Sequence, residues 1–160
     1  LGYRIDEITN KINELAKFFK ISSLLSERID LLTIEKRILI KILALLIIKP
    51  QIFGIDNLLG YLNETDKKNL LTFCVSNKIT LINCTNNGED LLISDKVLLL
   101  NDMKTIFYGD KKELLNGNTI LPYIGINLPF TAEMSQNLVL YGIINKVYLD
   151  EKKLVDKIWK

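Results

Sequence analysis

The chain contains no histidine among its 160 residues, and this absence removes several classes of active site. A Ser-His-Asp triad, a Cys-His pair and every metal site with a histidine ligand are excluded. No glycine is followed by lysine, so the phosphate-binding pattern G-x-x-x-x-G-K-[ST] does not occur in this sequence. Cysteine is scarce, and Cys74 and Cys84 lack a CxxC spacing, which predicts reduced, buried thiols of an intracellular protein.

A strong charge and long apolar runs are missing as well. The net charge is only +2, with Lys and Arg scattered among Asp and Glu, so we expect no nucleic-acid partner. The most hydrophobic run, residues 38–48, contains Lys41 and is shorter than the roughly 20 apolar residues of a membrane-spanning helix. We therefore expect a buried core helix there and no transmembrane segment. The chain starts at Leu1 rather than Met, which suggests a trimmed or excerpted chain. No signal peptide is visible, because the first residues are already charged and amphipathic.

The apolar pattern predicts a layered α/β domain. Helices are predicted at residues 5–20, 34–48, 64–76 and 87–93, and strands at 51–56, 79–84 and 96–100. The strand-length runs are continuously apolar, which is typical of strands buried on both faces of a parallel sheet. Strands and helices alternate along the chain, as in α/β domains. We expect Glu89 and Asp90 to lie on a solvated helix face rather than to form a metal cluster with Asp95.

After residue 98 the pattern changes to a hairpin and short helices. Residues 98–109 predict two strands joined by a tight turn at Asn101-Asp102. A short helix is predicted to end near Gly117, and the remaining residues predict a small helical appendage. Its predicted helices cover 131–143, capped by Thr131, and 150–159, capped by Asp150. The last helix either docks on the domain or contacts another subunit.

The strand predicted at 51–56 delivers a carboxylate, Asp56, to its carboxyl end. Open α/β sheets bind their ligands at this edge, and an Asp in this place holds Mg²⁺ in phosphate-transferring enzymes. The alternative is that Asp56 merely turns the chain after the strand.

The order of motifs resembles the second half of an ATP-binding-cassette (ABC) ATPase. The segment "DLLTIEKRILIKILALLIIKP" lies where that family has its Leu-Ser-Gly-Gly-Gln signature, and "QIFGIDNLLGYLN" lies at its Walker B strand. The segment "ITLINCTNNGEDLLISDKVLLLNDMKTIFYG" resembles its switch region. The tail, "GINLPFTAEMSQNLVLYGI" followed by "VYLDEKKLVDKIW", is similar to the C-terminal extension of the ATPase subunits of energy-coupling factor (ECF) transporters.

The resemblance implies a partial P-loop NTPase fold of the α/β class, with a mostly parallel sheet. A partial nucleotide-binding domain is expected over residues 1–117, with a helical subdomain at about 1–48 and the Walker B to switch region at about 50–109. A C-terminal helical extension is expected over 118–160. The missing phosphate-binding loop is explained most simply if the chain is the C-terminal part of a longer protein, and second by an evolved half-protein.

The sequence departs from the family at the positions that contact nucleotide. In the degenerate signature, Thr33 matches the family Ser, but Ile34 and Glu35 replace the two glycines. The glycines let the backbone approach phosphate at a helix N-terminus. A branched side chain crowds that approach, and a carboxylate repels the phosphate.

Three asparagines replace catalytic or loop residues. Asn57 stands at the catalytic Glu position, Asn86 at the switch His position, and Asn63 at the Asp that ends the loop after Walker B. An amide can orient water but cannot accept its proton, so Asn57 and Asn86 are predicted to be non-functional. Asp56 alone keeps its family identity, and we expect it to bind Mg²⁺ only if a phosphate-binding segment is supplied.

The resemblance implies a subunit of an ECF-type micronutrient importer that has lost hydrolysis and acts in assembly. The alternatives are the C-terminal portion of an ATP-hydrolysing ABC subunit, and a non-transport interaction module that retains the fold. We expect no cofactor on this chain alone, whereas the parent family uses Mg-ATP. The implied partners are a second ABC ATPase subunit, in a heteromer, and a membrane coupling protein. The implied location is cytoplasmic, peripheral to the inner face of the cell membrane.

Overall fold

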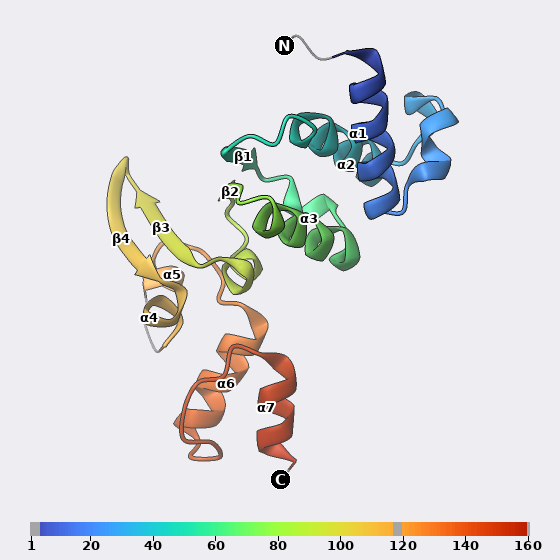
Figure 1. The fold of residues 1–160 in the computed structure, drawn as a ribbon. Helices are drawn as coiled ribbons and strands as arrows, with labels where there is room; N and C mark the ends of the chain where they lie inside the picture. Colours follow the sequence, from blue (N-terminus) through green and yellow to red (C-terminus); the bar gives the residue numbers. More distant parts are fainter. Residues whose placement is uncertain (1–3, 117–119, 160) are drawn as a thin grey trace. The chain divides into compact units, whose positions relative to one another are not determined.

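The computed structural model describes residues 4–116 and 120–159. The chain folds into two compact units, Leu1–Cys84 and Thr85–Lys160. The first unit contains α1 (Ile5–Phe18), α2 (Ile34–Leu46), β1 (Ile52–Asp56), α3 (Glu64–Ser76) and β2 (Thr80–Cys84), as Figure 1 shows. Its 3₁₀ helices are Ser22–Ser26, Ile29–Leu31 and Leu59–Tyr61. The helix end predicted near Gly117 and the predicted domain boundary at 117/118 lie outside the described residues.

The helices of the first unit begin at the caps that the sequence provides. Asp6 and Glu7 occupy the first turn of α1, where negative charge favours the helix dipole. Thr33 caps α2, which ends at Leu46 and so well before Pro50. A single hydrophobic core joins these helices to α3 and to one face of the strands. Its fully or nearly fully buried members include Leu39, Ile42, Leu46, Leu59 and Leu70.

The strands β1 and β2 form a two-stranded parallel sheet, paired from Ile52 opposite Thr80 to Asp56 opposite Cys84. The prediction that these strands are buried on both faces is wrong. Phe53 and Ile55 are buried, whereas Ile52 is 64% exposed. The burial alternates because the core of this unit packs against only one face of the sheet within the described residues. The other face, which carries Asp56, is open to solvent.

The second unit begins with a 3₁₀ helix, Gly88–Ile93, where an α-helix was predicted at 87–93. Its other elements are β3 (Lys96–Asn101), β4 (Lys104–Asp110), α4 (Lys111–Leu115), α5 (Ile120–Tyr123), α6 (Phe130–Leu140) and α7 (Glu151–Ile158). The strands β3 and β4 form the predicted antiparallel hairpin. Its turn lies one residue later than predicted, at Asp102 and Met103. Their positive φ angles of 47° and 58° fit the two-residue turns that match strand twist.

Of the two helix caps predicted in the helical appendage, one is present and one is not. Asp150 caps α7 as predicted, because its Oδ1 accepts a hydrogen bond from the Lys153 backbone N–H at 2.9 Å. The prediction that Thr131 caps the preceding helix is wrong. That helix, α6, begins at Phe130, and Thr131 is buried inside its first turn. The core of this unit includes Leu114, Leu115, Leu121 and Ala132, all fully buried.

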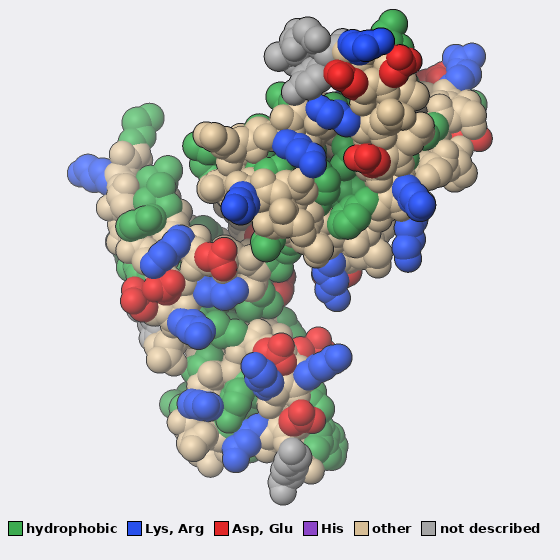
Figure 2. All heavy atoms as spheres, in the orientation of Figure 1, with side chains coloured by type: hydrophobic (Ala, Val, Ile, Leu, Met, Phe, Trp, Pro, Cys, Tyr) green, Lys and Arg blue, Asp and Glu red, His purple; other side chains and the backbone are tan. Residues whose placement is uncertain are grey.

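The surface offers no continuous basic stripe on the face drawn in Figure 2, where Lys and Arg lie among Asp and Glu. Within residues 4–116 and 120–159, no helix is both long enough and apolar enough to cross a lipid bilayer. Of the two free cysteines, Cys74 is buried as predicted, whereas the prediction of a buried Cys84 is wrong. Cys84 is exposed because it ends β2 on the open face of the sheet.

Candidate functional site

The carboxyl ends of β1 and β2 bring a carboxylate and an amide to one edge of the sheet. Asp56 ends β1 opposite Cys84, and the Asn57 backbone N–H donates to the Cys84 carbonyl at 2.8 Å. This bond extends the strand pairing by one residue. Both Asp56 and Asn57 are exposed. Asn57 adopts a left-handed backbone with φ of 53°, a conformation that Asn tolerates better than most other residues.

The edge of the sheet does not by itself form a metal site. Mg²⁺ prefers octahedral oxygen ligands and is usually held by one or two carboxylates together with substrate phosphates. Asp56 supplies one such carboxylate. Among the described residues, no group of three or more Cys, Asp or Glu side chains is placed to hold a metal. Asp56 therefore fits a Mg²⁺ ligand only alongside phosphate oxygens held by other groups.

The predicted signature residues lie at the N-terminus of α2, and one of them, Thr33, caps this helix. The Thr33 side-chain Oγ1 accepts a hydrogen bond from the Lys36 backbone N–H at 3.4 Å. The pKa of the Glu35 carboxyl lies below its usual range. The main cause is a hydrogen bond from the Thr33 hydroxyl, and the next is a hydrogen bond from the backbone N–H of Glu35. Ile34 is 51% exposed beside them. The positive end of the helix dipole is thus already faced by a carboxylate of the chain.

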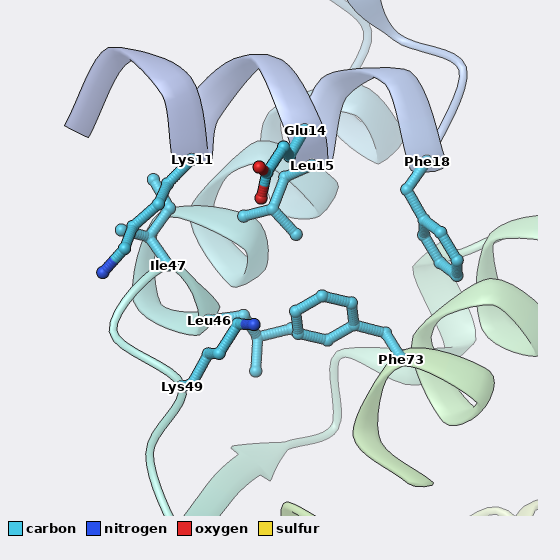
Figure 3. A pocket seen from close by; sticks show the side chains of 8 residues that line it. All are labelled: Lys11, Glu14, Leu15, Phe18, Leu46, Ile47, Lys49 and Phe73. Atoms are coloured by element: carbon cyan, nitrogen blue, oxygen red, sulfur yellow. The ribbon is translucent and has the colours of Figure 1, made fainter. Parts of the chain in front are cut away.

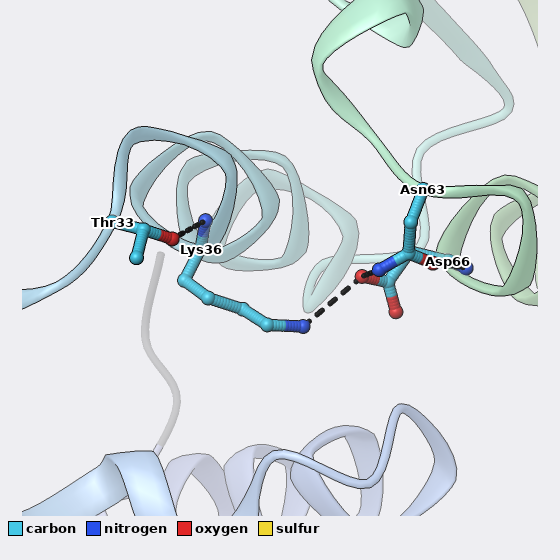
Figure 4. A network of polar contacts seen from close by, with 4 residues as sticks. All are labelled: Thr33, Lys36, Asn63 and Asp66. Carbon is cyan, nitrogen blue, oxygen red and sulfur yellow. Dashed lines mark hydrogen bonds and ion pairs between the residues drawn. The ribbon is translucent and has the colours of Figure 1, made fainter.

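Asn63 also serves as a helix cap. Its Oδ1 accepts a hydrogen bond from the Asp66 backbone N–H at 2.8 Å, and its Nδ2 donates to Asp66 Oδ2 at 2.9 Å. Asp66 is buried, and its Oδ2 also lies 3.1 Å from Lys36 Nζ (Figure 4). The pair joins the first turn of α2 to the first turn of α3. The spacing of Asn63 and Asp66 signals the local cap, whereas nothing in the sequence signals the bond across 30 positions.

Asn86 lies in the second unit, in an exposed turn just before the 3₁₀ helix. The Asn87 backbone N–H donates to Thr85 Oγ1 at 3.0 Å, and Asn87 Oδ1 accepts from the Glu89 backbone N–H at 3.1 Å. The prediction of a solvated helix face is confirmed for Glu89, which is exposed, and wrong for Asp90. Asp90 is buried, and Glu89 accepts a hydrogen bond from the Phe130 backbone N–H at 2.7 Å.

A cavity and a groove of the first unit, formed by described residues, are both mainly apolar. A cavity of about 200 Å³ lies between α1, the end of α2 and α3, with Phe18, Leu46 and Phe73 in its wall (Figure 3). A groove of about 310 Å³ lies between α1, the following 3₁₀ helices and α2. Glu27 is the one charged side chain among the described residues that line this groove. Lys11, Glu14 and Lys49 are the charged residues that line the cavity, whereas no Lys or Arg is among the described residues that line the groove.

Comparison with characterised proteins identifies the kind of protein that this chain resembles. No protein-family model matches the chain. The energy-coupling factor transporter ATP-binding protein EcfA of Pediococcus pentosaceus is 27% identical over 160 residues, which cover 96% of this chain and 57% of the relative. The EcfA1 protein of Streptococcus thermophilus is 22% identical over 164 residues, covering 99% of this chain and 59% of the relative. The chain thus spans less than three fifths of these relatives.

Solved structures give the same result for the fold. A structure of cbiO1 from Clostridium perfringens, described as part of the ABC transporter complex cbiONQ, superposes with a TM-score of 0.64 at 18% identity. The superposed region covers 85% of this chain and 56% of the cbiO1 chain. The ATP-binding cassette MJ1267 in its ADP conformation superposes with a TM-score of 0.61 at 18% identity, covering 78% and 53%. The chain is therefore similar to part of the ATP-binding proteins of energy-coupling factor transporters, and it has the α/β fold of a partial ABC ATPase domain.

Proposed function

We propose that this chain is part of an ATP-binding subunit of an ECF-type micronutrient importer and acts in subunit assembly without hydrolysing ATP itself. The supporting observation is that its signature-position and loop residues cap the chain's own helices. Thr33 accepts from the Lys36 backbone, and Asn63 accepts from the Asp66 backbone. Glu35 adds negative charge at the helix end where a phosphate would bind in the parent family. These side chains would have to leave their present partners to contact nucleotide.

The loss of hydrolysis also follows from the chemistry of Asn57. General base catalysis is typically worth about 10²- to 10⁴-fold in rate, and a neutral amide cannot supply it. Asn86 cannot supply it either, and the chain has no histidine to take over. We propose that this chain alone binds no cofactor. Asp56 would hold Mg²⁺ only beside a phosphate-binding segment, and there the ion would neutralise phosphate charge.

The proposed partners are a second ABC ATPase subunit, in a heteromer, and a membrane coupling protein. This would place the chain in the cytoplasm, peripheral to the inner face of the cell membrane. The apolar groove beside α1 and α2 is our candidate contact for an apolar helix of the coupling protein, because its lining is almost free of charge. The two relatives named above are transporter ATP-binding proteins by name.

A matched pair of variants tests this partner contact. Leu25 lines the groove and is 50% exposed, whereas Val75 is 79% exposed and lies outside the groove. We expect Leu25→Asp to weaken binding of the purified coupling protein of the same transporter by at least about tenfold, because it places a charge in an apolar contact. Val75→Asp should leave binding unchanged. Equal effects of the two variants would contradict the assignment of the groove.

Calorimetric titration of the chain with Mg-ATP tests the proposed loss of nucleotide function. We expect no saturable binding in the micromolar range and no phosphate release above background. Micromolar binding that Asp56→Asn weakens would contradict the proposed loss of nucleotide function, because Asp56 keeps an exposed carboxylate at the sheet edge. Binding to neither the coupling protein nor an ATPase partner would favour a non-transport interaction module.

A further inference from the structure

The segment Thr85–Glu89, which carries the switch position Asn86, is fastened to the start of α6 by one long-range hydrogen bond. Glu89 Oε1 accepts from the Phe130 backbone N–H at 2.7 Å, across 41 positions of the chain. Phe130 is the first residue of α6, and the N–H groups of a first helical turn have no partner within the helix. The Glu89 carboxylate provides such a partner and also places negative charge at the positive end of the helix dipole.

Close packing reinforces this bond at the neighbouring residue. A methyl group on Gly88 would overlap the backbone carbonyl oxygen of Asn127, so only glycine allows the two backbones to approach this closely. Gly88 itself is buried. The segment is therefore held against the residues before α6 by both a side-chain bond and a backbone contact.

Within the segment, one further bond spans Asn86 and a second one follows it. Asn87 N–H donates to Thr85 Oγ1 at 3.0 Å, and Glu89 N–H donates to Asn87 Oδ1 at 3.1 Å. The chain from Thr85 to Glu89 is thus a short, internally bonded turn whose far end is attached to α6. A movement of α6 would be transmitted to it over very few rotatable bonds.

The helix α6 is in turn anchored to other parts of the same unit. The fully buried Ser135 accepts a hydrogen bond at its Oγ from the Tyr148 backbone N–H at 2.7 Å. Gln136 Nε2 donates to the Leu115 carbonyl at 2.8 Å. The helix therefore connects the end of α4, the segment before α7 and the turn around Asn86.

We propose that the C-terminal extension sets the conformation of the turn Thr85–Glu89, and that Glu89 is the positioning residue that fastens this turn to α6. The extension then acts as a conformational control on the switch position. The inference goes beyond the proposed function and does not depend on whether the chain hydrolyses ATP.

Native-state hydrogen exchange of the full chain, read at single amides, tests the proposal. In Glu89→Ala, the amide of Phe130 should exchange about tenfold faster or more, because it loses its charge-assisted bond. The amides of Asn87 and of residue 89 should also exchange about tenfold faster or more, because the turn that holds them is no longer fastened to α6. Glu89→Gln keeps an acceptor of the same length and should remain closer to the wild-type chain. The amide of Lys153 in α7 should be unaffected in both variants.

A carboxylate in the same first turn of α6 provides the matched control. Glu133 is exposed and lies near the same helix end, so Glu133→Ala changes the charge there without touching the Glu89 bond. We expect it to leave exchange at Asn87 unchanged. Gly88→Ala forces apart the backbones of Gly88 and Asn127 without removing the Glu89 carboxylate. It should accelerate exchange at Asn87 as Glu89→Ala does. This second variant keeps the test decisive if Glu89→Ala does not fold.

Three results would overturn the proposal. One is unchanged exchange at Asn87 in both Glu89→Ala and Gly88→Ala. Another is an equal acceleration at Lys153, because Glu89 would then stabilise the whole unit without positioning the turn. The third is an equal acceleration at Asn87 in Glu133→Ala, because charge at the helix end would then explain the effect.

Discussion

The ion pair between Lys36 and Asp66 is expected to couple α2 energetically to α3. Lys36 Nζ lies 3.1 Å from Asp66 Oδ2, and the two side chains are 34% and 8% exposed. The perturbation is a double-mutant cycle of Lys36→Met, Asp66→Asn and the combination of the two. Met keeps most of the apolar stem of lysine and Asn keeps the shape of aspartate, so the cycle isolates the charged interaction.

The size of this coupling follows from the burial of the pair. Two unit charges about 4 Å apart attract by about 4 kcal/mol at an effective dielectric constant of about 20. Desolvation of the buried Asp66 and the lost rotamer freedom of Lys36 offset much of this attraction. Hydrogen bonds to charged groups retain about 1.5–3 kcal/mol after such losses, and the partial exposure of Lys36 lowers the value further. We therefore expect a coupling energy of about 1–2 kcal/mol.

Hydrogen exchange of core amides in α2 and β1 measures this coupling, because it reports unfolding of the first unit separately from that of the second. The pair formed by Arg28 and Asp30 provides the control. Its side chains are 78% and 57% exposed, so solvent screens the pair and its cycle should give a coupling close to zero. A coupling of Lys36 and Asp66 as small as that of the control would refute the reasoning from burial.

Three further predictions concern single side chains. Cys84 should react with a thiol reagent before Cys74, because Cys84 is exposed whereas burial of Cys74 shields it and raises the pKa of its thiol; equal rates would contradict this placement. Asp150→Ala should destabilise α7 by about 1 kcal/mol through loss of its cap, as measured by thermal melting followed at Trp159, and Glu151→Ala should cost clearly less. A hydrogen bond to Asp110 raises the pKa of Lys96 above its ordinary 10.5, so this pair should persist below that pH and be lost as the pH rises through the elevated pKa. NMR titration of Lys96 in Asp110→Asn should show the pKa falling back, and an unchanged pKa would argue against the pair.

Much of the first unit could be predicted from the sequence because its signals are local. The apolar spacing of residues 34–48, followed by Pro50, gave α2 to within two residues at its end. The helix over Glu64–Ser76 was predicted with the bounds that the structure has. These elements depend on side-chain periodicity and capping within a few positions, which a single sequence displays.

The wrong predictions depend on contacts between distant residues. The start of α6 could not be located from Thr131. The backbone N–H of Phe130, the first residue of α6, donates its hydrogen bond to Glu89, which lies 41 positions earlier in the chain. The strands of the first sheet were predicted to be buried on both faces, yet an apolar run cannot show whether anything covers the second face. The bond of Lys36 to Asp66 is invisible for the same reason, although the local cap of Asn63 onto Asp66 is visible.

The left-handed backbone of Asn57 sets which side chains this position can carry without strain. For most residues this conformation costs about 1–2 kcal/mol, whereas a short amide side chain relieves part of the cost through local hydrogen bonds. A glutamate in place of Asn57 would begin with this strain. The backbone conformation of this one residue therefore favours asparagine here, whatever the side chain does chemically.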